Sequence, residues 1–312
     1  PNLTITFPDM IHTYEHNYFA PNIIFDMIYL INILKKYDNI FVSYQHYDSD
    51  KYKVNTQNQQ NQQNQQNQQN QQNTQSTSNN YALINLITFY TTKFYVLSSS
   101  FILWQNSENY YVDQNIKINT QNLIKKHKNL RFIIIKIGIL LHTTAHANIM
   151  LYDKKYGIVE RFEPYGTSPC LLKDADKFDN FLATIVQDIF GNHVKYCKPE
   201  TFMQHTKFQM VSGERKEDET IFGDPAGYCL AWCYWFIELK FKNSNTNYST
   251  KQLLELALDK IIGNKKQNYT HNPIMQHIRN YAYKLTAMKN DYIRNILPPE
   301  YTHRIGYYGD NL

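Results

Sequence analysis

Apolar residues gather most densely in the middle of the chain, in a pattern that predicts strands. Residues 130–141 (LRFIIIKIGILL) are rich in β-branched side chains and short enough for one buried strand, which Lys136 interrupts. Residues 146–153 and 157–164 flank a polar turn and therefore predict a hairpin. A further strand-like segment lies at 193–199. We expect these segments to form a central mixed sheet that leans toward antiparallel pairing.

Helical spacing of apolar residues predicts several helices around this sheet. The segments with such spacing are 21–36, 171–190, 250–262 and 273–296. Gly191 suits the C-cap of the second segment, and Ser249 or Thr250 suits the N-cap of the third. A long apolar run that starts at Cys229 predicts one more helix. This order of strands and helices is typical of an α+β fold.

The 312 residues are enough for one large domain or two ordinary ones. Residues 55–80 form an Asn/Gln repeat without apolar side chains. Such a repeat cannot offset the entropy cost of ordering, so we expect a disordered insertion. The insertion divides the chain into an N-terminal helical segment over 1–54 and a main domain with C-terminal helices over 81–312. Because the sequence starts at Pro1 and not at Met, we expect a trimmed or processed N-terminus.

Composition narrows the class of partner. The net charge of +5 comes without a run of five or six like charges, so a nucleic-acid partner is not expected. The longest apolar stretch, 132–141, falls far short of the roughly 20 residues that span a bilayer, so a membrane partner is not expected either. Four cysteines without a secretory segment favour reduced thiols. We therefore expect a cytosolic protein.

Candidate chemistry centres on Cys229, which follows the turn signal DPAGY at the head of a predicted helix. A cysteine nucleophile needs a nearby imidazole and a third group that fixes the tautomer of that imidazole. The predicted hairpin brings His146 and Glu163 to the same end, where the carboxylate could accept a hydrogen bond from the imidazole. The alternative is an ordinary buried thiol. Trp232 and Trp235 are expected to pack this helix against the sheet.

The sequence does not indicate metal or cofactor chemistry. His142 lies four residues before His146, but the segment is predicted to be extended and lacks the Glu that follows the first His of a zincin. Cys233 lies one helical turn beyond Cys229, where a core position is expected. No CxxC pair supports a zinc site. We therefore expect neither a metal ion nor a cofactor.

Two blocks of the sequence resemble a known family: residues 146–166 (HANIMLYDKKYGIVERFEPYG) and 224–243 (DPAGYCLAWCYWFIELKFKN). They are similar to the SUMO-protease-like cysteine protease superfamily, which includes the adenovirus protease, and especially to its members from large DNA viruses. The likeness covers roughly residues 81–245. It implies a papain-like or adenain-like core with the nucleophile at the N-terminus of a buried helix. For a viral chain it implies a location in the host cytoplasm or the virion.

The resemblance also implies a role for each candidate residue. Cys229 would attack a peptide or isopeptide carbonyl, His146 would act first as base and then as acid, and Glu163 would orient His146. The oxyanion would be bound by the backbone N–H of Cys229 and by a Gln side chain. Gln209 is the candidate for this Gln by its order in the chain, and Gln204 is the runner-up.

The chain departs from the SUMO-protease type around these residues. Ala147 stands where Trp is usual, and Glu163 stands where Asp is usual. Tyr228 and Leu230 replace the Asp and Gly that normally flank the cysteine. Asp224 could reach the site, but it would repel an oxyanion unless it were protonated.

Three functions are open from the sequence. The first is a cysteine peptidase or isopeptidase acting on a protein substrate, either a ubiquitin-like conjugate or a viral polyprotein. The second is a binding module that keeps the fold and recognises a modifier or a virion protein without cleaving it. The third is a structural virion protein that associates through residues 55–80. None of the three requires a cofactor.

Overall fold

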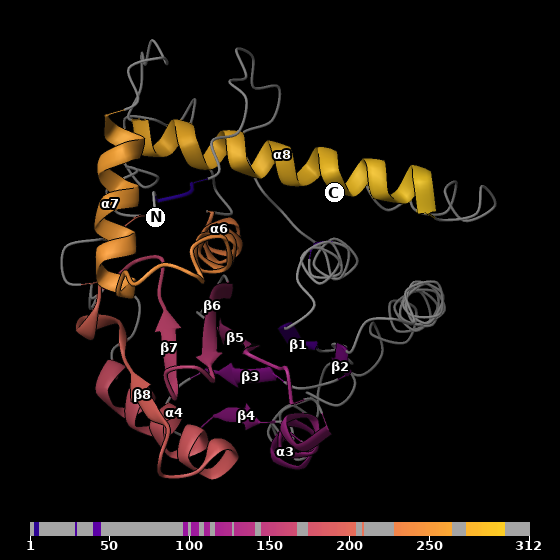
Figure 1. The fold of residues 1–312 in the computed structure, drawn as a ribbon, viewed down its shortest axis with the longest axis vertical. Helices are drawn as coiled ribbons and strands as arrows, with labels where there is room; N and C mark the ends of the chain where they lie inside the picture. Colours follow the sequence, from indigo (N-terminus) through magenta and orange to yellow (C-terminus); the bar gives the residue numbers. More distant parts are fainter. Residues whose placement is uncertain are drawn as a thin grey trace, which may run out of the picture.

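The structure is a computed structural model that describes thirteen parts of the chain. These are residues 3–5, 29, 40–44, 96–98, 101–105, 109–112, 116–126, 128–140, 145–166, 174–203, 208, 228–263 and 273–296. They form an α+β fold in which helices lie on both faces of one mixed sheet (Figure 1). The expected α+β class and central mixed sheet are confirmed.

Three antiparallel strands form the centre of the sheet. Strand β5 (Phe132–Leu140) pairs with β6 (Ala145–Asp153), and β6 pairs with β7 (Ile158–Phe162). The register of the second pair places Ile149 opposite Phe162. The predicted buried strand and the predicted hairpin are therefore both present, with ends that differ by one or two residues.

Parallel strands extend the sheet on both sides of this centre. Strand β8 (Lys195–Cys197) runs parallel to β7. On the other side, β1 (Ile40–Tyr44) and β3 (Phe101–Trp104) pair in parallel with successive halves of β5. Strands β2 (Val96–Ser98) and β4 (Tyr110–Val112) pair with β1 and β3. The sheet is thus more mixed in direction than the sequence suggested.

Helices cover the two faces in different ways. On one face α6 (Cys229–Lys242) lies between the sheet and an outer layer of α7 (Thr250–Ile262) and α8 (Pro273–Ile296), as Figure 1 shows. On the other face lie α3 (Ile116–Lys126) and α4 (Ala175–Phe190). Helix α6 is apolar nearly all round because it is enclosed on both sides. A short 3₁₀ helix, Pro199–Thr201, follows β8.

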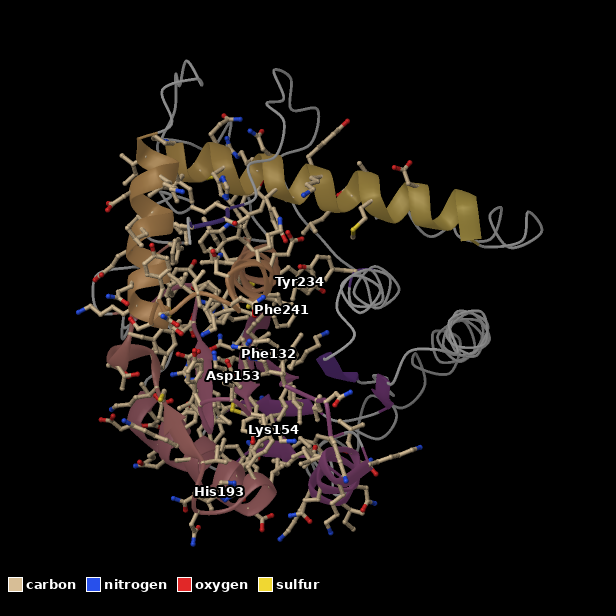
Figure 2. All side chains as sticks on the ribbon, viewed as in Figure 1. Phe132, Asp153, Lys154, His193, Tyr234 and Phe241 are labelled. Atoms are coloured by element: carbon tan, nitrogen blue, oxygen red, sulfur yellow. The ribbon has the colours of Figure 1, made fainter. Side chains whose placement is uncertain are left out.

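Alternate residues of β5 belong to the two hydrophobic cores on opposite faces of the sheet. Phe132 and Ile134 belong to the core that contains α6, whereas Ile133 and Ile135 belong to the core that contains α4. Figure 2 shows Phe132 near Phe241 of α6, and their ring centroids lie 5.0 Å apart. The apolar run therefore serves a strand that is buried on both faces.

Two predicted helix caps are present. Gly191 is the C-cap of α4, with φ of 90°, and its N–H donates to the carbonyl of Gln187. Ser249 is the N-cap of α7 and forms a capping box with Gln252. Helices α7 and α8 begin and end where the sequence predicts. Residues 171–173 of the predicted helix before Gly191 lie outside the described residues.

The tryptophans of α6 contact the outer layer of helices. The rings of Trp232 and Trp235 contact Phe208, with centroids 4.9 and 5.1 Å away. Both rings also contact His277 of α8, at 6.3 and 5.9 Å. They therefore pack α6 against its outer layer. The sheet-facing side carries Phe236, which stacks on Phe162 of β7 at 4.3 Å.

The N-terminal part of the chain contributes to the same fold. Strand β1 joins the sheet, and Leu3 and Tyr29 are buried in the core that contains α6. The rest of the helix predicted over 21–36, and the Asn/Gln tract over 55–80, lie outside the described residues. The division into 1–54, 55–80 and 81–312 stays a prediction. None of the described helices is both long enough and apolar enough to cross a membrane.

Candidate functional site

The thiol of Cys229 lies where α6 meets the start of β6. Cys229 is the first residue of α6, and its side chain is 9% exposed. The backbone N–H of Ala147 donates to its Sγ at 3.5 Å. One turn later, the thiol of Cys233 donates to the carbonyl of the same Ala147, also at 3.5 Å, and it lies in the core as expected. The two thiols therefore fix α6 to one residue of β6.

His146 and Glu163 meet at the open end of the β6–β7 hairpin. His146 Nε2 and Glu163 Oε1 are 2.5 Å apart, and their side chains are 4% and 6% exposed. Cys229 lies close enough to the imidazole to raise the pKa of His146. The fold thus brings together Cys229, His146 and Glu163, three of the four residues selected from the sequence. Their proposed roles stay predictions.

The turn after β7 holds the carboxylate in place. Glu163 is the first residue beyond β7, and its Oε1 also accepts the N–H of Tyr165 at 3.0 Å. The N–H of Gly166 closes the turn by donating to the carbonyl of Glu163 at 2.8 Å. Gly166 has φ of 68°, a conformation that glycine adopts without steric cost. The Tyr165 ring packs edge-on against the imidazole, with centroids 5.3 Å apart.

The electrostatics of the site favour an ion pair between His146 and Glu163. Burial alone lowers the pKa of His146, but the charge of Glu163 and the hydrogen bonds to Cys229 and Glu163 raise it to about 10. Burial alone raises the pKa of Glu163, but His146, Arg161 and the N–H of Tyr165 together hold it below its usual range. At neutral pH the pair is therefore imidazolium and carboxylate.

Two further residues that the sequence analysis did not select contact this carboxylate. Asn148 Nδ2 donates to Glu163 Oε2 at 2.9 Å, and Arg161 Nη1 lies 3.6 Å from the same oxygen. Residues two apart on a strand share a face. Asn148 follows His146 by two residues, and Arg161 precedes Glu163 by two. The strand period was therefore the signal in the sequence that could have identified both.

The side-chain candidates for the oxyanion lie outside the described part of the chain, whereas the backbone N–H of Cys229, the other expected donor, belongs to the first residue of α6. The side chains are those of Gln209, Gln204 and Asp224. Within the described ranges, no three His, Cys, Asp or Glu side chains gather in a way that could hold a metal ion. The described site places a thiol beside a carboxylate-held imidazolium, an arrangement that in general activates a cysteine as nucleophile.

Comparison with known proteins gives one distant similarity. No family model matches the chain. Over 188 residues it is 27% identical to a protein of Acanthamoeba polyphaga mimivirus named "Putative ankyrin repeat protein L371". The match covers 57% of this chain but 23% of the length of that relative.

This finding corrects the family assignment. It contradicts the expected membership of the SUMO-protease-like superfamily, and with it the cysteine peptidase activity and the thiol-protease description that the resemblance implied. The name of the relative describes that protein and not the fold of this chain. An ankyrin repeat is about 33 residues of turn and paired helices, whereas the described parts of this chain build a mixed sheet.

Proposed function

We propose that this chain is a protein-binding module. The observation that carries the proposal is the 188-residue segment that it shares with a protein named for ankyrin repeats. Repeat proteins of that kind present extended surfaces to which other proteins bind. A segment that accompanies such repeats in one chain is well placed to recognise the same kind of partner. The partner class is therefore a protein.

The burial of the thiol site supports binding in preference to turnover. Cys229 is 9% exposed, and His146 and Glu163 are 4% exposed each. In this proposal the three residues stabilise the junction between α6 and the hairpin.

Exposed tyrosines supply candidate contact points for a partner. Tyr110, Tyr156 and Tyr283 are each more than half exposed. Tyrosine is enriched at protein interfaces because its ring gives a large contact area and its hydroxyl forms hydrogen bonds. The ring of Tyr156 also has Lys155 Nζ 5.0 Å from its centroid and Arg131 Cζ at 5.9 Å. An acidic partner surface would complement this neighbourhood.

At the level of fold alone, we propose that the module uses a papain-like arrangement. Support comes from a cysteine at the N-terminus of a buried helix, packed beside a strand that carries histidine. An arrangement of this kind does not by itself imply a function.

The proposal is tested with the partner itself. Tagged chain, as wild type and as Cys229→Ala, captures proteins from an extract of mimivirus-infected Acanthamoeba, and each captured protein is then purified alone. Calorimetry with the purified protein measures its affinity, and intact mass spectrometry measures its mass before and after prolonged incubation. We expect equal affinity for both chains, weaker binding by Tyr156→Ala, Tyr110→Ala or Tyr283→Ala, and an unchanged mass. A partner that is cut by wild type and left whole by Cys229→Ala would show that the proposal is wrong.

A further inference from the structure

A buried series of polar contacts continues from Glu163 across the sheet to α4 and β8. Arg161 of β7 lies at its centre. Its Nη1 donates to Asn148 Oδ1 at 2.8 Å, and its Nε and Nη2 donate to the two carboxylate oxygens of Asp179 at 3.0 and 2.9 Å. Tyr196 accepts a hydrogen bond from Arg161 Nε at 3.1 Å and donates its own hydroxyl proton to Asp179. Arg161 is therefore held on the α4 side of the sheet by a two-point contact.

The charges in this series balance only when His146 is included. Asp179 and Glu163 are each 4% exposed, and Arg161, which lies between them, is 2% exposed. Charges that are removed from water need nearby opposite charges. Arg161 offsets one of the two carboxylates, and the imidazolium of His146 offsets the other.

Asn148 connects this charged group to the thiol. Its side-chain oxygen, Oδ1, accepts a hydrogen bond from Arg161. This contact orients the Asn148 side chain so that its Nδ2 donates to Glu163 Oε2 at 2.9 Å. The same amide donates to the carbonyl of Ala147 at 3.0 Å. Ala147 is the residue whose N–H contacts the sulfur of Cys229. A change at Arg161 therefore reaches the thiol site both through Glu163 and through Asn148.

We infer that Arg161 and Asn148 are positioning residues for the thiol site. They fix the orientation of the Glu163 carboxylate, and the carboxylate in turn holds the His146 imidazole against Cys229. Asp179 and Tyr196 act one step further away by fixing Arg161. Within the described parts of the chain, the titratable groups that face His146 are Glu163 beyond β7 and Cys229 of α6, with the Tyr165 ring at its edge. This inference concerns the internal geometry of the site and does not depend on the proposed protein binding.

The variants are chosen so that the protein still folds. Asn148→Ala removes one neutral contact. Arg161→Met combined with Asp179→Leu removes both members of the buried ion pair, because a single substitution would leave an uncompensated charge. The matched control is Arg131→Met combined with Asp153→Leu. That pair has the same two-point geometry, at 3.2 and 3.1 Å, but lies at the far end of β6.

The first readout is the titration of His146, followed by NMR of protein labelled at histidine ¹³Cε1 and assigned with His146→Gln. We expect its pKa to fall by about one unit or more in Asn148→Ala and in the Arg161/Asp179 double variant. In the Arg131/Asp153 double variant, His146 should titrate as in wild type, even where the thermal stability drops as far as in the Arg161/Asp179 double variant. Arg161→Lys keeps the positive charge but cannot make the two-point contact. We expect the pKa of His146 in this variant to lie between its values in wild type and in the Arg161/Asp179 double variant.

The second readout is the rate at which iodoacetamide alkylates Cys229 at pH 6, measured by intact mass and peptide mapping. We expect a fall of about tenfold in the two site variants, because an imidazolium displaced from Cys229 assists loss of the thiol proton less, and no change in the control. The inference is overturned if both site variants fold and leave the His146 titration and the alkylation rate unchanged. It is also overturned if the control moves the two readouts as far as the site variants do.

Discussion

At the scale of single residues, two buried histidines respond to pH in opposite directions. The raised pKa of His146, about 10, means that its contribution to stability is complete below pH 6.5 and is lost as the pH rises through 10. His277 of α8 lies beside the rings of Trp232 and Trp235 of α6, and burial lowers its pKa to about 3. Between pH 6.5 and 3 the unfolded chain therefore binds one more proton at His277 than the folded chain. His277 accordingly costs stability as the pH falls.

His277→Gln tests this assignment, because glutamine is polar but does not titrate. We expect the free energy of unfolding of wild type to fall between pH 6.5 and 4.5 more steeply than that of the variant, by about 1.4 kcal/mol per pH unit. Urea unfolding at half-unit steps of pH measures both slopes. His193→Gln changes an exposed histidine and serves as the control. Equal slopes for wild type and His277→Gln would contradict the prediction.

At the scale of elements, the position of α6 depends on both of its sides. One side packs on the sheet through Phe236, and the other packs on α8 through Trp232 and Trp235. Helix α7 is joined to this layer by a short connection that ends in the Ser249 capping box. The contacts on each side therefore fix where the first residue of α6, Cys229, meets β6.

Phe236→Ala removes the stacked contact between α6 and β7. Because Phe236 is fully buried, we expect a loss of about 3–5 kcal/mol in the free energy of unfolding. Leu256→Ala on α7, where the side chain is 36% exposed, should cost far less. Urea denaturation followed by tryptophan fluorescence compares the two. A similar loss at both positions would mean that the stack does not hold α6 to the sheet.

Ser249→Ala removes the side-chain acceptor at the start of α7. The hydroxyl oxygen of Ser249 accepts the N–H of Gln252 at 3.2 Å, and Gln252 Oε1 accepts the N–H of Ser249 at 2.9 Å. We expect a loss of about 1 kcal/mol for Ser249→Ala and of a few tenths for Ser249→Gly. Thermal unfolding by circular dichroism resolves the order of the two variants. The reverse order would refute a capping role.

The elements predicted from the sequence are those with a strong local signal. The long periodic segments of α7 and α8 were located to the residue, and the apolar run of β5 and the turn between β6 and β7 were sufficient for the central strands. No assignment was made for α3 or for the short strands β1 to β4. Strand β1 pairs with β2 and β5, which lie far away in the sequence, so its pairing is not encoded in any local window. Strands β3 and β4 pair locally with each other, but they are only four and three residues long, too short to give a clear periodic signal.

The residues of the candidate site also divide into those with a local signal in the sequence and those without one. Cys229, His146 and Glu163 were found because a helix start and a hairpin each have a sequence signature, and the fold then brings the two together. Arg161 and Asn148 were not selected, although the strand period places them beside Glu163 and His146, because their contacts with each other and the contact of Arg161 with Asp179 are not visible in the local sequence. The contact of Trp232 and Trp235 with α8 was not predicted for a related reason. An all-apolar helix does not indicate which of its sides faces the sheet.

At the scale of the whole molecule, one buried ion pair joins three elements. Lys240 of α6 donates to Glu160 of β7 at 2.8 Å and to the hydroxyl of Thr250 at the start of α7 at 2.5 Å. Lys240 and Glu160 are 8% and 5% exposed. The Lys240 side chain therefore links α6 to the sheet and to α7 of the outer layer.

Lys240→Met leaves the Glu160 carboxylate buried without its partner, so we expect a loss of about 3–5 kcal/mol. Replacing both residues, as Lys240→Met with Glu160→Leu, should recover most of that loss because no buried charge is left. A double-mutant cycle in urea measures the coupling between them. Losses that simply add would mean that the two charges do not interact.

The order of the elements along the chain also sets an order of assembly during synthesis. Strands β5 to β7 pair with near neighbours and can form early, whereas α6 leaves the ribosome after them. Until α6 arrives, Phe132, Ile134 and Phe162 present bare apolar surface on one face of the nascent sheet. That interval is when the growing chain is most exposed to aggregation and to chaperones. The sulfur of Cys229 reaches a hairpin that is already formed, so the thiol site is among the last features of the molecule to be completed.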